Sequence, residues 1–151
     1  MLLRLINTES SVRAVGLKTS TNASVIFVID DLAILFARLS FGLTMAISHG
    51  LPKLLNYSGQ KSSFPHPIAL GSSTSLILVI FSEFFCSLFV SLGFKTRTSC
   101  LFLIITMLVA AFIIHAGDPW KKIEFPLLYA FGFIFIFITG GGKISIDDKL
   151  R

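Results

Sequence analysis

Charged side chains are scarce in this sequence. Only 14% of its 151 residues are Asp, Glu, Lys or Arg, whereas 54% are hydrophobic. A soluble domain usually carries about 25% charged residues, and the mean hydropathy here is +0.84. This composition excludes an ordinary soluble domain and favours a chain that is solvated by a lipid bilayer.

Cysteine is also rare, and the usual metal and phosphate motifs are missing. The two cysteines, Cys86 and Cys100, form no Cys-x-x-Cys pair, and their expected depths differ by roughly 9 Å, too far for a disulfide. There is no His-x-x-His pair and no nucleophile elbow, and glycines 140–142 lack the Lys-Ser/Thr of a phosphate loop. We expect two buried thiols and no metal or nucleotide cofactor.

Acidic residues are outnumbered, 8 against 13 Lys and Arg, which gives a net charge of +5. The basic residues stand singly beside apolar segments rather than in a stripe, which is typical of membrane-flanking charge and not of a nucleic-acid interface. If the N-terminus lies inside, the inner segments hold about twice as many Lys and Arg as the outer loops. The sequence therefore predicts that both termini are cytoplasmic.

Four long apolar segments cover residues 32–48, 73–94, 98–115 and 123–139. Each is about long enough to cross a bilayer as a helix. The sequence predicts an all-α membrane protein, a four-transmembrane-helix bundle, with one domain over residues 30–151. Residues 1–29 lack the apolar core and cleavage site of a signal peptide, so we expect a retained N-terminal cytoplasmic tail.

Two ionisable side chains lie inside these segments. Arg38 lies roughly 16 Å below the outer end of the first segment, and Glu83 roughly 15 Å below the outer end of the second. An unpaired charge in hydrocarbon costs at least about 2.5 to 3.5 kcal/mol, so we predict that Arg38 and Glu83 pair and form the floor of a polar cavity. Two structural alternatives are an ion pair that only fixes helix register, or Arg38 snorkelling to the inner surface beside a protonated Glu83.

Two histidines lie at the outer side of the predicted bundle. His49 ends the first segment, His115 ends the third, and Glu124 begins the fourth. Each has a structural explanation at a helix end, but together they favour an acid/base cluster, because histidine titrates near neutral pH. One stripe of the first helix is predicted to face the interior of the bundle, and it comprises Arg38, Gly42, Met45 and His49.

Several short motifs occur in a characteristic order. They are ARLSFGLTMAISHGLPKL in the first segment, SEFF around Glu83, SLGFKTR after the second, MLVAAFIIHAGDPW in the third, then Glu124 and GGGKISID. In this order and spacing, residues 31–150 resemble the DoxX family of small four-helix membrane proteins. The resemblance marks as family-pattern positions Arg38, His49, Gly50, Lys53, Glu83, Arg97, His115 and Asp147.

The resemblance also implies a function. Some relatives are subunits of a thiosulfate:quinone oxidoreductase or of membrane redox complexes that handle sulfur and oxidative stress. A multi-pass protein of the bacterial inner (plasma) membrane is then expected, with quinone as cofactor and with other membrane subunits or further copies of itself as partners. The candidate catalytic residues are Arg38, Glu83, His49 and His115, and the candidate substrate-binding residues are Lys53 and Glu124.

Two other functions are compatible with the sequence. A non-catalytic accessory or scaffold subunit is favoured by the absence of a cofactor ligand set. A small-molecule binder or transporter would need to form oligomers, because the chain has only four predicted spans and no inverted repeat.

Overall fold

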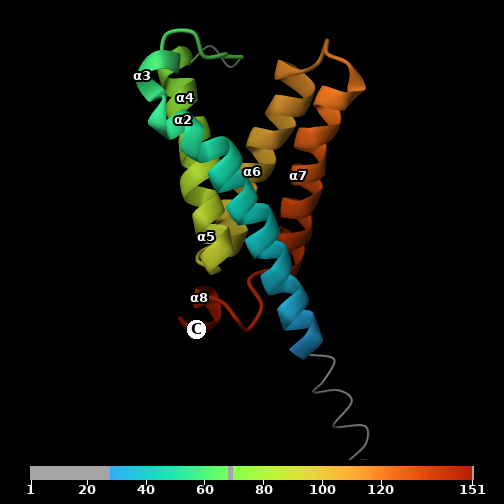
Figure 1. Ribbon diagram of the computed structural model, residues 1–151. Helices are drawn as coiled ribbons and strands as arrows, with labels where there is room; N and C mark the ends of the chain where they lie inside the picture. The colour runs from blue at the N-terminus through green and yellow to red at the C-terminus, as the bar shows by residue number, and fades with distance from the viewer. Residues whose placement is uncertain (1–27, 68–69, 151) are drawn as a thin grey trace, which may run out of the picture.

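Four long helices make up most of the protein (Figure 1). The computed structural model describes residues 28–67 and 70–150, and four helices in it are long and apolar enough to cross a membrane: Val28–Leu55, Ser72–Leu92, Thr96–Ile114 and Trp120–Thr139. The described residues contain no strand. The predicted four-transmembrane-helix bundle is confirmed. The predicted tail falls outside the described residues, except that residues 28 and 29 already belong to the first helix.

Three of the spans contain a π-helical stretch. In chain order, the elements after the α-helical residues 28–45 are η1 (Ala46–Gly50), α2 (Leu51–Leu55), α3 (Tyr57–Gln60), α4 (Ser72–Ile80), η2 (Phe81–Cys86), α5 (Ser87–Leu92), α6 (Thr96–Val109), η3 (Ala110–Ile114), α7 (Trp120–Thr139) and α8 (Ile146–Lys149). The stretches η1, η2 and η3 are the π-helices. Short π-helical stretches inside α-helices are frequent at functional sites.

The first span is longer than the sequence predicts. The predicted end near Ser48 rests on Gly50 and Pro52, but the helix continues to Leu55. In η1, the N–H of Leu51 donates to the carbonyl of Ala46, so the α-helical pattern is already interrupted where Pro52 cannot donate. Residues 49–55 are therefore part of the span.

The two ends of the bundle differ. We call the end that carries residue 28 and residues 140–150 the clamp end, and the end that carries residues 56–67 and 115–119 the cavity end (Figure 1). The spans lie close together towards the clamp end. Towards the cavity end, α2 and α4 form one arm and the outer parts of α6 and α7 form another.

Small residues allow the first and second spans to pack closely. Gly42, Ala46 and Gly50 recur every four residues on the first span, and all three are buried. A Cβ atom on Gly50 would lie 2.6 Å from the backbone carbonyl group of Glu83. Close approach through such a row of small residues is a common way to join membrane helices.

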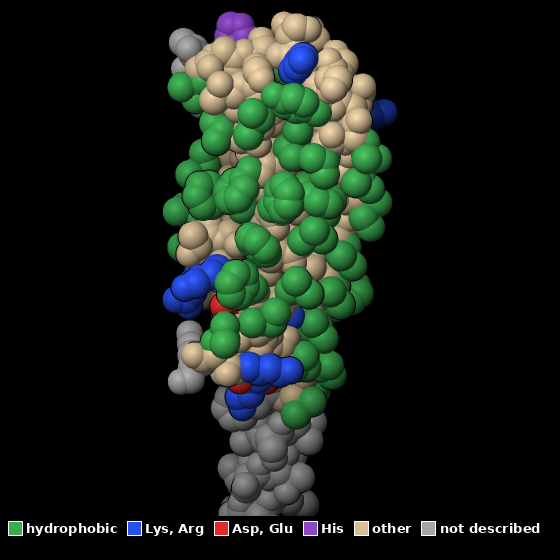
Figure 2. Space-filling view, turned by 90° about the vertical axis from the view of Figure 1, so that its left-hand side faces the viewer, with side chains coloured by type: hydrophobic (Ala, Val, Ile, Leu, Met, Phe, Trp, Pro, Cys, Tyr) green, Lys and Arg blue, Asp and Glu red, His purple; other side chains and the backbone are tan. Residues whose placement is uncertain are grey.

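Apolar side chains cover the outside of the bundle. Figure 2 shows a broad band of hydrophobic side chains without Lys, Arg, Asp or Glu, which appear only towards the two ends of that face. Phe131 and Phe135 are 63% and 49% exposed, while Phe133 lies in the core. This pattern is what a lipid-facing surface requires.

Residues 140–150 fold back over the clamp end and hold Arg38. This side chain is only 1% exposed. Its Nη1 atom donates to the carbonyl of Gly141 at 2.6 Å, and its Nη2 atom donates to that of Ile144 at 2.7 Å. The backbone N–H of Lys143 donates to Asp31 at 2.9 Å. The first span is thus bonded to the segment that follows the fourth.

Asp147 ties the same segment to the start of α6. Its carboxylate accepts the backbone N–H groups of Lys95 at 2.7 Å and Thr96 at 2.8 Å, which would otherwise lack partners at a helix N-terminus. Burial alone raises the pKa of Asp147, but the hydrogen bonds from Thr96 and Lys95 and the charge of Lys95 outweigh it, so the pKa lies below its usual value.

Candidate functional site

A cavity of about 880 Å³ opens among the four spans at the cavity end. This volume is typical of small-molecule sites, which are mostly apolar and contain a few polar groups. The first span contributes Met45, His49 and Lys53, which are spaced four residues apart and extend the predicted interior stripe past the predicted helix end. The other walls come from α4, η2, α6, η3 and α7.

A buried ion pair lies in the cavity wall. Lys53 Nζ donates to Glu83 Oε2, and the two side chains are 23% and 8% exposed. Glu83 comes from η2, and its backbone packs against Gly50 three residues before Lys53. Ionisable side chains inside a membrane span pair with one another and often mark a functional site.

The predicted pair between Arg38 and Glu83 is wrong. Arg38 bonds the backbone of residues 141 and 144 at the clamp end, and it does not line the cavity. The physical reason is the length of the first span. Since the helix continues through Pro52, Lys53 rather than Arg38 reaches Glu83, and about 22 Å of helix separates the two cations. The alternative in which Arg38 snorkels to the surface does not describe the arrangement either, because Arg38 is only 1% exposed.

His49 lies beside two aromatic rings of α7. Its ring centroid is 5.5 Å from that of Phe125 and 5.7 Å from that of Tyr129, and all three residues line the cavity. Tyr129 also packs edge-on against Phe41 at 6.0 Å. These aromatic contacts join the first and fourth spans beside the cavity.

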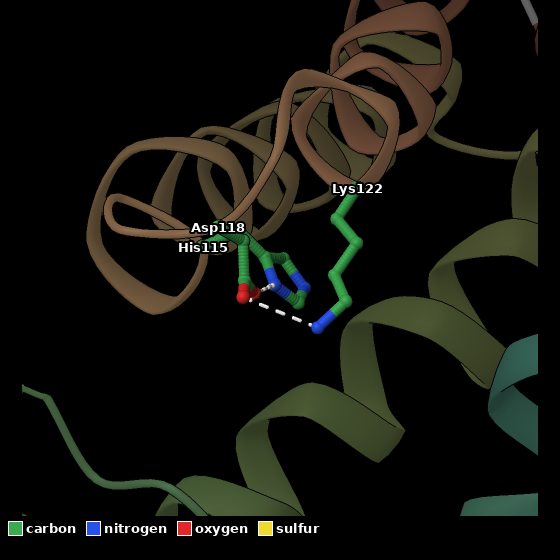
Figure 3. A network of polar contacts seen from close by, with 3 residues as sticks. All are labelled: His115, Asp118 and Lys122. Carbon is green, nitrogen blue, oxygen red and sulfur yellow. Dashed lines mark hydrogen bonds and ion pairs between the residues drawn. The ribbon is translucent and has the colours of Figure 1, made fainter.

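A polar network lies at the mouth of the cavity (Figure 3). His115 Nδ1 lies 2.7 Å from Asp118 Oδ2, and Lys122 Nζ donates to Asp118 Oδ1 at 3.1 Å. The hydrogen bond with His115 and then that from Lys122 lower the pKa of Asp118 below its usual value. The network connects the turn after η3 to the first turn of α7, and His115 and Lys122 also line the cavity.

The other sequence-predicted residues divide between the cavity and the surface. His49, Lys53, Glu83 and His115 all line the cavity, whereas Glu124 is exposed and does not. The catalytic and substrate-binding roles stay predictions. Among the residues that the structure describes, no group of three or more His, Cys, Asp or Glu side chains is arranged to hold a metal.

Among the polar residues of the cavity wall, Ser82, Thr106 and Tyr129 were not predicted from the sequence. The Thr106 hydroxyl donates to Ser82 at 2.8 Å, which links α6 to η2, and Tyr129 is only 6% exposed. All three are polar residues inside apolar segments, and each lies four residues, about one helical turn, after another residue that lines the cavity. That spacing, read along each predicted helix, would have revealed them.

The fold and the cavity define a helical membrane protein with four spans and a cavity at one end. A family model described as DoxX matches residues 33–116. The inner membrane protein YqjF of Escherichia coli strain K12 is 32% identical over 128 residues, which cover 82% of this chain and 95% of YqjF. No solved structure matches the chain.

The chain belongs to the DoxX family. It is a multi-pass inner-membrane protein, as its four apolar spans and its similarity to YqjF both indicate. The matched residues 33–116 include His49, Lys53, Glu83 and His115, whereas Tyr129 and the rest of α7 lie beyond them.

Proposed function

We propose that this protein holds a quinone in its cavity and acts as a quinone-binding subunit of a membrane redox complex. The observation that carries the proposal is the Lys53–Glu83 pair, which lies in the wall of an otherwise largely apolar cavity of about 880 Å³. A quinone has an apolar ring and tail and two carbonyl oxygens that accept hydrogen bonds. The cavity offers both kinds of surface.

The side chains that line the cavity could bind a quinone ring. Lys53 can donate to a ring carbonyl, and the aromatic rings of Phe125 and Tyr129 can pack against its face. Glu83 and His49 are groups that can exchange protons with the ring oxygens. A bound quinone would supply a carrier that accepts two electrons and two protons.

The reductant in this proposal is a pair of thiols on a partner subunit. Oxidation of two thiols to a disulfide releases two electrons and two protons, which balances the reduction of a quinone to a quinol. Cys86 and Cys100 do not supply them, because both thiols are buried in the core, at 1% and 0% exposure. In this proposal the partner subunit supplies the thiols that are oxidised, and this chain binds the quinone that is reduced.

Quinone binding can be measured through the single tryptophan. Trp120 does not itself line the cavity, but it immediately precedes Lys121 at the cavity mouth, and quinones quench indole fluorescence at short range. We expect a short-chain ubiquinone analogue to quench Trp120 saturably in the purified protein. Glu83→Gln and Lys53→Met should each weaken binding about tenfold or more, since Glu83→Gln removes the negative charge that holds Lys53 and Lys53→Met leaves the buried Glu83 without its partner.

Lys61→Met is the matched control. Lys61 follows α3, is exposed and does not line the cavity. The quinone affinity of the Lys61→Met variant should therefore stay within about twofold of that of the unchanged protein. Absence of saturable quenching by any quinone would refute the proposal. Binding that persists while thiol-dependent quinone reduction in membranes ignores Glu83→Gln would instead favour the accessory-subunit reading.

A further inference from the structure

We infer that the cavity opens sideways into the bilayer between the second and third spans, and that a long isoprenoid quinone enters there with its tail left in the lipid. This inference rests on the proposed function and adds the route and the length of the ligand. It distinguishes a ligand dissolved in the membrane from a substrate that arrives through water.

The rim has two kinds of edge. The edge towards the loops carries the cationic and imidazole side chains of His115, Lys121 and Lys122, together with the apolar residues Phe64, Pro65, Pro67 and Leu70 of the connection before α4. Among the described residues that line the cavity from α4 and α6, none is charged, and Leu78 and Ile105 are 50% and 52% exposed. An opening with an apolar rim between membrane spans is solvated by lipid chains rather than by water.

Side-chain contacts between η2 and α6 limit this lateral opening on the side towards the clamp end. Phe81 of η2 and Phe102 of α6 pack edge to face with their centroids 5.6 Å apart. Immediately beside them, Thr106 donates to Ser82 across the same two spans. Towards the cavity end, the α4 and α6 ribbons diverge (Figure 1). The contact between Phe81 and Phe102 and the hydrogen bond between Thr106 and Ser82 therefore close the gap between these spans on the side towards the clamp end.

The opposite side of the cavity is occupied by aromatic contacts. His49 lies against Phe125 and Tyr129 between the first and fourth spans. An apolar tail that leaves the cavity within the membrane therefore meets packed rings on that side and Leu78 and Ile105 on the other. A ring held near Lys53 and Glu83 would extend its tail between the second and third spans.

The test narrows the lateral opening with larger side chains. Leu78→Phe and Ile105→Phe add bulk at its rim. Ile77→Phe and Leu101→Phe are matched controls, because these neighbours are 52% and 47% exposed but do not line the cavity. The protein is reconstituted in phosphatidylethanolamine and phosphatidylglycerol vesicles, and the rate of Trp120 quenching is followed after mixing with donor vesicles that hold long-chain ubiquinone.

We expect the two rim variants to bind the long-chain quinone about tenfold more slowly than the two controls. A tail-less benzoquinone added from water should reach all four variants at rates within about twofold of one another. Equal rates for the long-chain quinone in rim and control variants would overturn the lateral route. Slowing of both quinones by the rim variants would also overturn it, because it would indicate a general loss of the cavity.

A second readout works without any quinone binding. In a Trp120→Phe background, Tyr129→Trp places the only indole at a buried position of the cavity wall. Phospholipids with brominated acyl chains should quench this indole, and Leu78→Phe with Ile105→Phe should reduce the quenching. If no quinone binds but brominated chains still quench through the rim, the proposed function fails and the lateral opening stands. Absence of bromine quenching removes the opening itself.

Discussion

At the scale of single residues, two buried cations have different tasks. Arg38 donates to two backbone carbonyls beyond the fourth span, and Lys53 donates to a carboxylate in the cavity wall. Backbone carbonyls that accept two of its N–H groups stabilise a buried guanidinium without creating a reactive site. Arg38 thus serves the assembly of the bundle, whereas Lys53 lines the cavity.

Substituting Arg38 separates these tasks. Arg38→Met leaves two carbonyls without their donors, so we expect the free energy of unfolding to fall by about 2 to 3 kcal/mol, with quinone affinity changed by no more than about twofold. A thiol-reactive dye can follow thermal unfolding, because both cysteines are buried until the bundle opens.

The control is Arg97→Met. Arg97 is exposed, and its one hydrogen bond to the carbonyl of Ile138 is long, at 3.4 Å, so its removal should cost less than about 0.5 kcal/mol. An Arg38→Met protein with unchanged stability but no quinone binding would restore the catalytic role that the sequence suggests.

At the scale of elements, the π-stretch η1 joins helix packing to the cavity. It allows the first span to continue through Pro52, and it presents Gly50 to the backbone of η2 at Glu83. The position of Lys53 relative to Glu83 therefore depends on two helices that approach each other through a residue without a side chain. A change in that packing should alter the chemistry of the cavity.

Gly50→Ala tests this connection. Its Cβ would lie 2.6 Å from the Glu83 backbone, which cannot move aside as a flexible side chain does. We expect a loss of about 1 to 3 kcal/mol in stability together with weaker quinone quenching of Trp120. Gly117→Ala is the comparison, because nothing lies within 4 Å of a Cβ there. Similar melting temperatures for the two variants would contradict the role assigned to Gly50.

At the scale of the whole molecule, the chain is fastened at one end and open at the other. Residues 140–150 connect the first, third and fourth spans at the clamp end through Arg38 and Asp147, while the cavity end holds the opening between the arms. The distribution of Lys and Arg in the sequence predicts that the clamp end faces the cytoplasm.

Single introduced cysteines can test this orientation. Gly117→Cys lies in the connection before α7, and Lys149→Cys lies in the exposed part of α8. Because the native thiols are buried, a membrane-impermeant maleimide should label only the new residue. We expect labelling of Gly117→Cys in spheroplasts, and of Lys149→Cys only after lysis. The reverse result would invert the predicted topology.

Much of this architecture could be predicted from the sequence, because long apolar runs can satisfy their backbone in lipid only as helices. The interior position of Met45 and His49 also followed from helical periodicity. Two features could not be predicted. The continuation of the first helix past Pro52 depends on a local π-turn, and the partner of Arg38 lies 103 residues further along the chain. Neither the continuation of the helix nor the partner of Arg38 leaves a local pattern in the sequence.

The clamp also has a consequence for biosynthesis. Translation delivers Arg38 early, but the carbonyl groups that receive its guanidinium are made 103 and 106 residues later. Until the nascent chain reaches that point, the cation must remain among lipid headgroups, water or the insertion machinery. Membrane insertion of the first helix and its final docking are therefore separate events, and the second can occur only after residues 141 and 144 have been synthesised.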